Sequence, residues 1–133
     1  MDKIKKDALL SVRHLTVEYT SEGEVIHAVN DVSFELEKGK TIGLAGETGA
    51  GKTSIAKAIL RILPEPPARV KNGEIWFEGR ELLGLKEEEM RKIRVKNISM
   101  IFQDPMTALN PIMRIGEQIA EVIRLHEKCG KAQ

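Results

Sequence analysis

The stretch GETGAGKT, residues 46–53, lies between a short apolar run at 41–45 and a segment at 52–63 whose apolar residues recur at helical spacing. The glycines let the backbone curl so that successive N–H groups point into one concavity, and a helix N-terminus after the loop favours an anion. The spacing therefore predicts a phosphate-binding loop between a buried strand and a helix. A glycine-rich turn that fits the pattern by chance is the alternative interpretation.

Each residue at the end of the loop has its own predicted contact with a nucleoside triphosphate or with Mg²⁺. Lys52 is expected to reach the β- and γ-phosphates as a point charge, and the Thr53 hydroxyl is the expected Mg²⁺ ligand. Ser54 can offer its hydroxyl to the α- or β-phosphate. The predicted binding residues of this segment are Gly46, Glu47, Thr48, Gly49, Ala50, Gly51, Lys52, Thr53 and Ser54.

Upstream of the loop, the sequence predicts an antiparallel sheet. Residues 8–19 and 25–36 are rich in β-branched and alternating apolar residues, with a polar turn at 20–24 between them. The second strand could break at 30–31, where Asn and Asp are adjacent.

Downstream of the loop, the prolines at 64–67 are expected to end the helix that follows it. The remaining predicted elements are a strand at 73–79, a charged helix at 86–96, a buried strand at 97–102, an irregular segment at 103–111 and an amphipathic helix at 112–126. In the charged helix Met90, Ile93 and Val95 are expected to face inward, and the other side is expected to carry i,i+4 charge pairs. The apolar side of the last helix comprises Ile112, Ile115, Ile119, Val122, Ile123 and His126.

Composition excludes several classes of protein. The 133 residues carry 21 basic and 20 acidic side chains, a net charge of +1, so no overall basic field indicates a nucleic-acid partner. The single cysteine, Cys129, forms no internal disulfide, which suits a reducing compartment. No stretch reaches the roughly 18 apolar residues that span a bilayer. His14, His27 and His126 lack metal-ligand spacing, and ordinary structural roles are expected for them.

Several stretches resemble the ATPase subunits of ABC transporters. AVNDVSFELEKGKTIGLAGETGAGKT, residues 28–53, is similar to the family's run into its phosphate loop, and Tyr19 stands where the family places an aromatic residue that stacks on adenine. Gln103 follows a predicted buried strand, where the family places its Q-loop glutamine. QDPMTALNP at 103–111 and ILPEPPARVKNGEIWFEG at 62–79 resemble the oligopeptide, dipeptide and nickel importers.

The resemblance implies an α/β fold, the N-terminal part of a P-loop NTPase core with an antiparallel β-subdomain and the start of a helical subdomain. It implies that Tyr19 contacts the base of ATP, and that Gln103 ligates Mg²⁺ together with Thr53 and senses the γ-phosphate. Without the family context, Tyr19 is an aromatic residue that packs at a strand end, and Gln103 is a polar strand-end residue.

Parts of the family pattern are absent from the sequence. The signature of the LSGGQ type, the Asp-Glu pair that ends the Walker B strand, and the switch histidine do not occur in it. Residues 1–133 are therefore expected to be the N-terminal part of such a domain, one that binds Mg-ATP without efficient hydrolysis. Such a chain is expected to be less stable than a whole domain, or to associate with itself through exposed strand edges.

The resemblance also implies partners. These are a second ATPase subunit, identical or different, and transmembrane permease subunits that contact the segment from Gln103 to Pro111. The location would be cytoplasmic, at the inner face of the cell membrane, with no nucleic acid.

Other interpretations remain. Asp104 after an apolar run could position Mg²⁺ as in other P-loop proteins, such as a small kinase or GTPase. The chain could also be a nucleotide-binding module without catalysis that only associates with partners.

Overall fold

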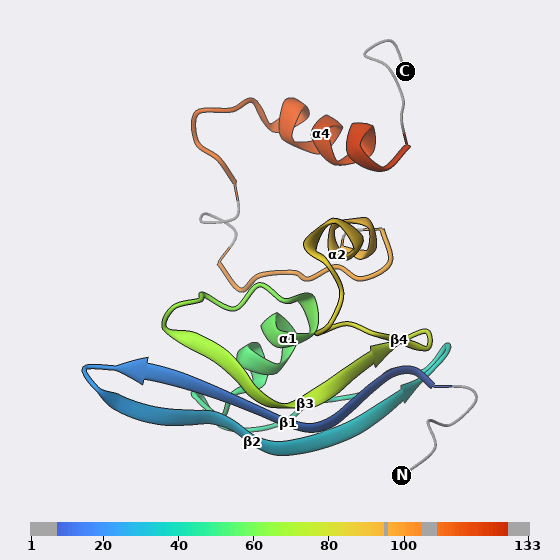
Figure 1. Cartoon of the computed structure of the whole chain (residues 1–133). Coiled ribbons are helices and arrows are strands. Elements are labelled where there is room, and N and C mark those ends of the chain that lie inside the picture. The colour runs from blue at the N-terminus through green and yellow to red at the C-terminus, as the bar shows by residue number, and fades with distance from the viewer. Residues whose placement is uncertain (1–7, 95, 105–108, 128–133) are drawn as a thin grey trace. The chain divides into compact units, whose positions relative to one another are not determined.

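The computed structural model describes residues 8–94, 96–104 and 109–127 (Figure 1). The chain divides into two compact units, Met1–Lys86 and Glu87–Gln133. The first unit contains β1 (Ala8–Ser21), β2 (Glu24–Glu37), α1 (Lys52–Leu60), β3 (Ala68–Phe77) and β4 (Arg80–Glu81). The second contains α2 (Glu87–Ile93) and α4 (Ile115–Glu127).

The first unit is built on an antiparallel sheet with the strand order β2-β1-β3-β4 (Figure 1). β1 and β2 form the predicted hairpin, in which Ser21 pairs with Glu24. The turn residues Glu22 and Gly23 both have positive φ, 52° and 86°, as a type I′ turn requires. This two-residue turn matches the right-handed twist of its strands and fixes the register from the Ser21–Glu24 pair to the Glu18–His27 pair, beyond which the register shifts.

The predicted break at 30–31 does not occur, because side chains satisfy the backbone at the irregular positions. His14 and Asp31 both have positive φ, 49° and 51°. The Asp31 N–H donates to Thr16 Oγ1 at 3.2 Å, and the His14 N–H donates to Ser33 Oγ at 2.8 Å. His14 Nδ1 also lies 2.7 Å from the Asp31 carboxylate. β2 therefore stays paired with β1 on both sides of the bulge.

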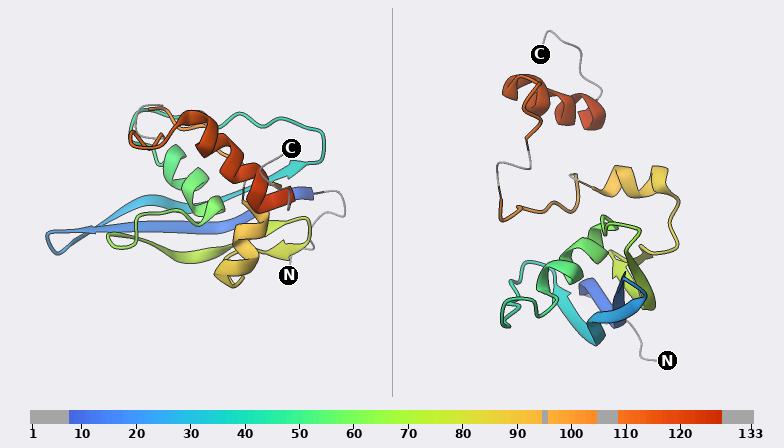
Figure 2. Two further views of the ribbon diagram at one scale, coloured as in Figure 1. Left: turned by 90° about the horizontal axis from the view of Figure 1, so that it is seen from above. Right: turned by 90° about the vertical axis from the view of Figure 1, so that its left-hand side faces the viewer.

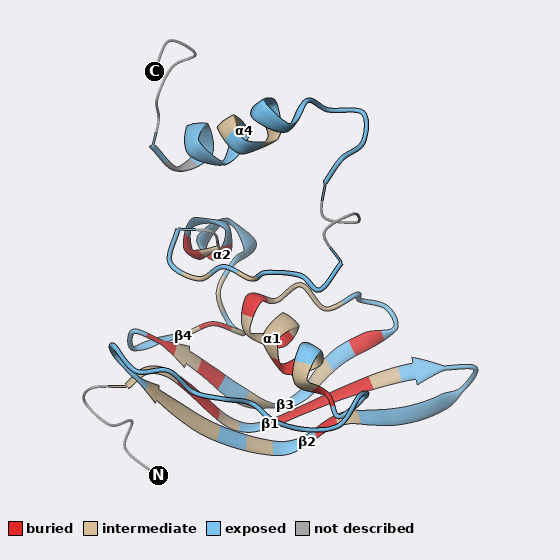
Figure 3. Cartoon of the chain, turned by 180° about the vertical axis from the view of Figure 1, so that it is seen from behind, coloured by how far each residue is buried: buried red, intermediate tan, exposed pale blue. Residues whose placement is uncertain are grey.

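Helix α1 packs on one face of the sheet, against β1 and β2 (Figures 1 and 2). Figure 3 shows buried residues along β1 and on α1. Each large apolar side chain buried here stabilises the fold by about 1.5–3 kcal/mol. The buried apolar residues of this unit are Val12, Leu15, Val17, Val29, Ile55, Ala58, Leu60, Ala68, Ile75, Phe77 and Leu82.

The helix after the loop is confirmed but ends earlier than residue 63. Arg61 adopts the left-handed conformation, with φ 52° and ψ 46°. Its N–H donates to the Ala58 carbonyl at 3.0 Å, and the Ile62 N–H donates to the Lys57 carbonyl at 2.9 Å, the hydrogen bonds of a Schellman motif. The helix therefore ends before the prolines at 64–67 are reached.

Two predicted buried strands are wrong. Residues 41–45 form no strand, and Ile42 and Leu44 are exposed. At 97–102 there is a single parallel bridge between Ile98 and Arg94, and the side chain of Ile101 is 97% exposed. A strand requires a neighbouring strand for its backbone hydrogen bonds. The ladders formed by the described residues involve β1 to β4 and do not include these segments.

The strand predicted at 73–79 is confirmed in part. β3 begins at Ala68, because residues 68–72 pair with the end of β1. Gly73 has a φ of 114°, and a Cβ there would lie 2.6 Å from the Leu15 Cα. Glycine therefore allows β3 to pass the bulge of β1. The short strand β4 was not predicted.

In the second unit both predicted helices form with shifted ends. Met90 and Ile93 of α2 are buried, as predicted, whereas Val95 lies outside the described residues. The i,i+4 pair of Glu87 and Arg91 is present at 3.7 Å. The apolar residues of the last predicted helix are exposed. They are Ile112, Ile115, Ile119, Val122 and Ile123, and the His126 side chain is outside the described set.

Candidate functional site

The loop between β2 and α1 turns through glycines with left-handed backbone. Gly49 and Gly51 have φ values of 84° and 81°, and the Ala50 N–H donates to the Glu47 carbonyl at 3.1 Å. Gly51 is buried, and a Cβ there would lie 2.1 Å from the Ala28 carbonyl oxygen and 3.2 Å from Val29 Cγ2. Ala28 and Val29 of β2 thus support the loop, which sequence reasoning did not foresee.

The first turn of α1 offers free backbone donors beside this loop. The Ile55 N–H donates to the Gly51 carbonyl at 2.9 Å, so the N–H groups of residues 52–54 have no acceptor within the helix. The N-cap residue is Gly51, without a side-chain cap, and the first turn of α1, described in full, contains no acidic residue. These donors and the helix dipole favour an anion at this place.

Lys52 brings a positive charge to the same place. Its ammonium donates to the carbonyl oxygens of Gly46 and Glu47, at 2.5 and 2.6 Å. Because a lysine ammonium has three N–H bonds, one remains for a ligand. The Thr53 hydroxyl belongs to an exposed side chain on the first turn of α1. Oxygen donors of this kind suit Mg²⁺, so the residues present fit a magnesium-bound phosphate.

Tyr19 lies close to this helix although it belongs to β1. It pairs with Ile26 of β2 and Ala68 of β3, and the next residue, Thr20, donates its N–H to the Pro67 carbonyl at 3.0 Å. Its hydroxyl lies 3.2 Å from Ser54 Oγ. The structure therefore brings together two residues that the sequence predicted for different parts of one ligand.

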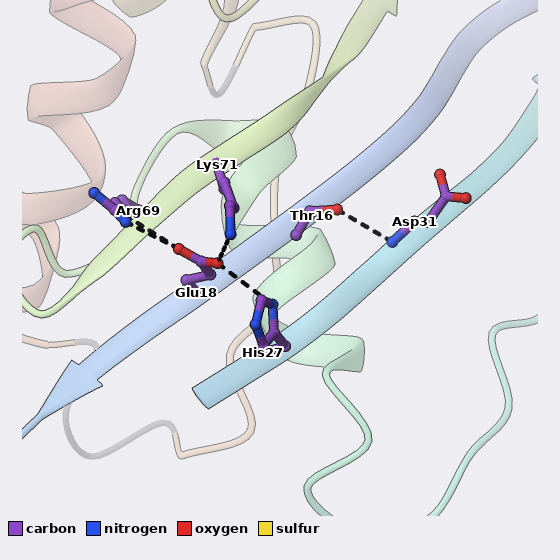
Figure 4. Close-up of polar contacts among 6 residues, drawn as sticks. All are labelled: Thr16, Glu18, His27, Asp31, Arg69 and Lys71. Carbon is purple, nitrogen blue, oxygen red and sulfur yellow. Dashed lines mark hydrogen bonds and ion pairs between the residues drawn. The ribbon is translucent and has the colours of Figure 1, made fainter. Parts of the chain in front are cut away.

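Next to Tyr19, the Glu18 carboxylate is buried in a cluster of basic side chains (Figure 4). Lys71 Nζ lies at 2.5 Å, Arg69 Nη2 at 3.1 Å and His27 Nδ1 at 3.4 Å from its oxygens. The hydrogen bond from Lys71 lowers the pKa of Glu18 against the opposing effect of burial, and Arg69 lowers it further. The cluster joins β1, β2 and β3 at the residue before Tyr19.

Gln103 belongs to the second unit, so its predicted place beside Thr53 stays a prediction. Gln103 and Asp104 are exposed, and residues 105–108 of the predicted permease-contacting segment lie outside the described residues. Beyond them, the Gln118 amide donates to the carbonyl oxygens of Asn110 and Met113, at 2.9 and 3.0 Å. These bonds fold the segment 109–114 onto the start of α4.

Comparison with known proteins gives concordant results. A family model described as ABC transporter matches residues 29–133. The oligopeptide transport ATP-binding protein of Bacillus subtilis (strain 168) is 46% identical over 128 residues, which are 96% of this chain and 36% of that protein. That of Escherichia coli (strain K12) is 47% identical over 127 residues, 96% of this chain and 37% of the relative. The chain thus spans little more than a third of the length of these relatives.

A solved structure shows the same fold. The dimeric structure of a post-hydrolysis state of an ATP-binding cassette bound to ADP and Pi superposes with a TM-score of 0.73 at 19% identity, covering 92% of this chain and 50% of that one. This confirms the predicted α/β fold class, the N-terminal part of a P-loop NTPase core with an antiparallel β-subdomain. Among the described residues, no helix is long and apolar enough to cross a membrane.

Proposed function

This chain belongs to the ABC transporter family, and we propose that it binds Mg-ATP as the N-terminal part of the ATP-binding subunit of an importer for oligopeptides, dipeptides or a similar small solute. The observation that carries this proposal is the loop at 46–53. It combines left-handed glycines, the uncapped start of α1 and the Lys52 ammonium within one short segment.

The triphosphate would lie against the start of α1. The free N–H groups of residues 52–54 would donate to phosphate oxygens, and the remaining N–H of Lys52 would contact the β- and γ-phosphates. Thr53 would hold Mg²⁺ through its hydroxyl, with Gln103 as a second ligand. When bound, the magnesium ion neutralises part of the phosphate charge.

The base would stack on Tyr19. An aromatic ring offers an apolar face to a purine. The Tyr19 hydroxyl lies 3.2 Å from Ser54 Oγ on the first turn of α1, which supports a ligand that contacts both Tyr19 and this helix. The remaining predicted loop contacts, Gly46 to Gly51, would be made mainly through the backbone.

The chain would work with partners at the inner face of the cell membrane. Residues 1–133 lack the LSGGQ-type signature and the Walker B carboxylates, so we propose that they bind Mg-ATP without efficient hydrolysis. A second ATPase subunit, identical or different, would complete the site, and permease subunits would contact the segment from Gln103 to Pro111.

The test is titration of the chain with a fluorescent ATP analogue, with and without Mg²⁺, followed by a phosphate-release assay. Lys52→Ala is expected to abolish binding, whereas Lys40→Ala, which removes a lysine from the exposed turn before the loop, is expected to bind as the wild type does. ATP should compete with the analogue more strongly than GTP.

Other results would change the proposal. A wild-type chain that binds no nucleotide would overturn it, and a preference for GTP would favour a P-loop protein of another class. Phosphate release above the Lys52→Ala background would place a catalytic base within these residues, and Asp104 would be the first to test.

A further inference from the structure

We propose that Tyr19 orients Ser54 toward the phosphates through its hydroxyl, as a positioning residue, in addition to any contact of its ring with the base. This inference rests on the proposed function, because it concerns the same site. The Tyr19 hydroxyl would then strengthen phosphate binding even for a ligand without a nucleobase.

The geometry that carries the inference is the contact between the two hydroxyl groups. Tyr19 Oη and Ser54 Oγ lie 3.2 Å apart although the residues are 35 positions apart in the sequence, and both side chains are half-buried. Ser54 is on the first turn of α1, the part of the helix against which the triphosphate is proposed to lie. A hydrogen bond here joins the end of β1 to the phosphate-binding end of α1.

The position of Tyr19 is fixed by its neighbours on both sides. Tyr19 lies between β2 and β3, and the Thr20 N–H is bonded to the Pro67 carbonyl. On the other face of β1, the buried Glu18 holds Lys71 and Arg69 of β3 and His27 of β2 (Figure 4). Successive strand residues point to opposite faces, so this cluster anchors the strand from the side opposite α1.

The direction of the hydrogen bond follows from the charge of the ligand. Either hydroxyl can donate in the structure itself. If Ser54 donated to Tyr19, only its oxygen lone pairs would remain for the anion, which repels them. If the phenol donates to Ser54, the serine proton is free to donate to a phosphate oxygen. An anion therefore favours the order from Tyr19 to Ser54 to phosphate, and the two bonds strengthen each other.

Tyr19 can affect ATP binding in two ways, by stacking on the nucleobase and by orienting Ser54, and measurements with ATP alone would not distinguish them. Tyr19→Phe keeps the aromatic ring and removes the hydroxyl. If Tyr19 only stacks on the base, this variant binds inorganic tripolyphosphate as the wild type does. If Tyr19 orients Ser54, the affinity for tripolyphosphate and for ATP falls by a similar factor, about five-fold for the loss of one hydrogen bond.

The experiment measures the Mg²⁺-dependent affinity of the full chain for ATP and for tripolyphosphate by competition with the fluorescent analogue. The variants are Tyr19→Phe, Ser54→Ala, their combination and Ser54→Thr, each with its thermal midpoint to show that it is folded. Ser21→Ala is the matched control, since it removes an exposed hydroxyl near the same end of β1. We expect the double variant to bind no more weakly than Ser54→Ala, because the tyrosine hydroxyl acts through the serine. Ser54→Thr keeps a hydroxyl and should restore both the affinity and its dependence on Tyr19.

The outcomes are distinguishable. Unchanged tripolyphosphate affinity in Tyr19→Phe, with a wild type that binds ATP, would overturn this inference and leave the proposed function intact. Additive losses in the double variant would also overturn it. A wild type that binds neither ligand would overturn the proposed function and this inference with it.

Discussion

A Cβ atom at Gly51 would lie 2.1 Å from the carbonyl oxygen of Ala28, so β2 leaves no room for a side chain at the start of α1. The same glycine has a φ of 81°, which other residues adopt only with strain. The hairpin and the phosphate loop are therefore joined at a position where the backbones touch.

Gly51→Ala is expected to displace the loop from β2 and to abolish nucleotide binding. Strain from the positive φ and overpacking against Ala28 together should lower the free energy of unfolding by about 3 kcal/mol. Urea denaturation and titration with the ATP analogue measure the two effects. Gly23→Ala is the control, because Gly23 has a similar φ of 86° but nothing within 4 Å of an added Cβ. It should cost about 1 kcal/mol and leave binding unchanged. Equal effects of the two variants would contradict the steric argument.

The Glu18 cluster predicts a loss of stability in acid. Because the hydrogen bond from Lys71 and that from Arg69 lower the pKa of Glu18 below its ordinary value of 4.5, the carboxylate stabilises the fold above that pH. This stabilisation disappears as the pH falls through the lowered pKa in the folded state. Among the described residues, the charged and titratable groups that face Glu18 are Lys71 and Arg69 of β3 and His27 of β2.

The measurement is the urea midpoint of the wild type and of Glu18→Gln from neutral pH down to below the ordinary pKa of the carboxyl group. The wild type should be the more stable at neutral pH, and the difference should shrink in acid. Glu24→Gln, at the exposed tip of the hairpin, controls for the loss of a negative charge. A difference between wild type and Glu18→Gln that stays constant with pH would rule out this account.

Arg61 is expected to contribute to stability through its side chain and to cost stability through its backbone. Its guanidinium donates to the carbonyl oxygens of Leu82 and Leu85, at 3.2 and 2.6 Å, whereas its φ is 52°. Arg61→Ala should lower the free energy of unfolding by about 2 kcal/mol, since it removes these bonds and keeps the strain. Arg61→Gly should lower it by about 1 kcal/mol less, because glycine tolerates the left-handed conformation. A glycine variant as unstable as the alanine variant would show that the backbone carries no strain.

The exposed apolar residues predict self-association of the 133-residue chain. Ile42 and Leu44 are exposed before the loop, and Ile101 is almost fully exposed. Sedimentation velocity should show oligomers that increase with concentration, and Ile101→Lys should reduce them. Ser21→Lys adds the same charge at an exposed polar position and should not. A chain that stays monomeric at every concentration would mean that the apolar residues are covered in solution.

The elements that depend on local pattern were predictable from the sequence, and those that depend on distant partners were not. The hairpin and α1 follow from alternation, turn chemistry and helical spacing. The segments at 41–45 and 97–102 have the composition of buried strands, yet a strand forms only where another one pairs with it, and composition does not reveal whether that neighbour is present. The burial of Met90 and Ile93 was predictable because both lie on the apolar side of an amphipathic helix.

In the candidate site, too, the local features were predictable and the contacts between distant segments were not. The loop, Lys52 and Thr53 are contiguous in the sequence, so their proximity needs no tertiary information. The contact of Tyr19 with Ser54 depends on how α1 lies on the sheet, which no pattern in either segment indicates. One signal was missed: a two-residue turn at 22–23 places Glu18 directly opposite His27, and the structure has this pair. The contacts of Glu18 with Arg69 and Lys71 of β3 could not be predicted without the register between β1 and β3.

The two hydrogen bonds from the Lys52 ammonium to carbonyl oxygens affect the entropy of ligand binding. A lysine side chain usually loses its rotational freedom when a ligand arrives, and this loss opposes association. Here the side chain is already held by Gly46 and Glu47, so the loss occurs when the chain folds. The Lys52 ammonium is therefore already in position when a phosphate binds. The association rate then depends on diffusion and on the release of water, and not on the time the lysine needs to reach its bound rotamer.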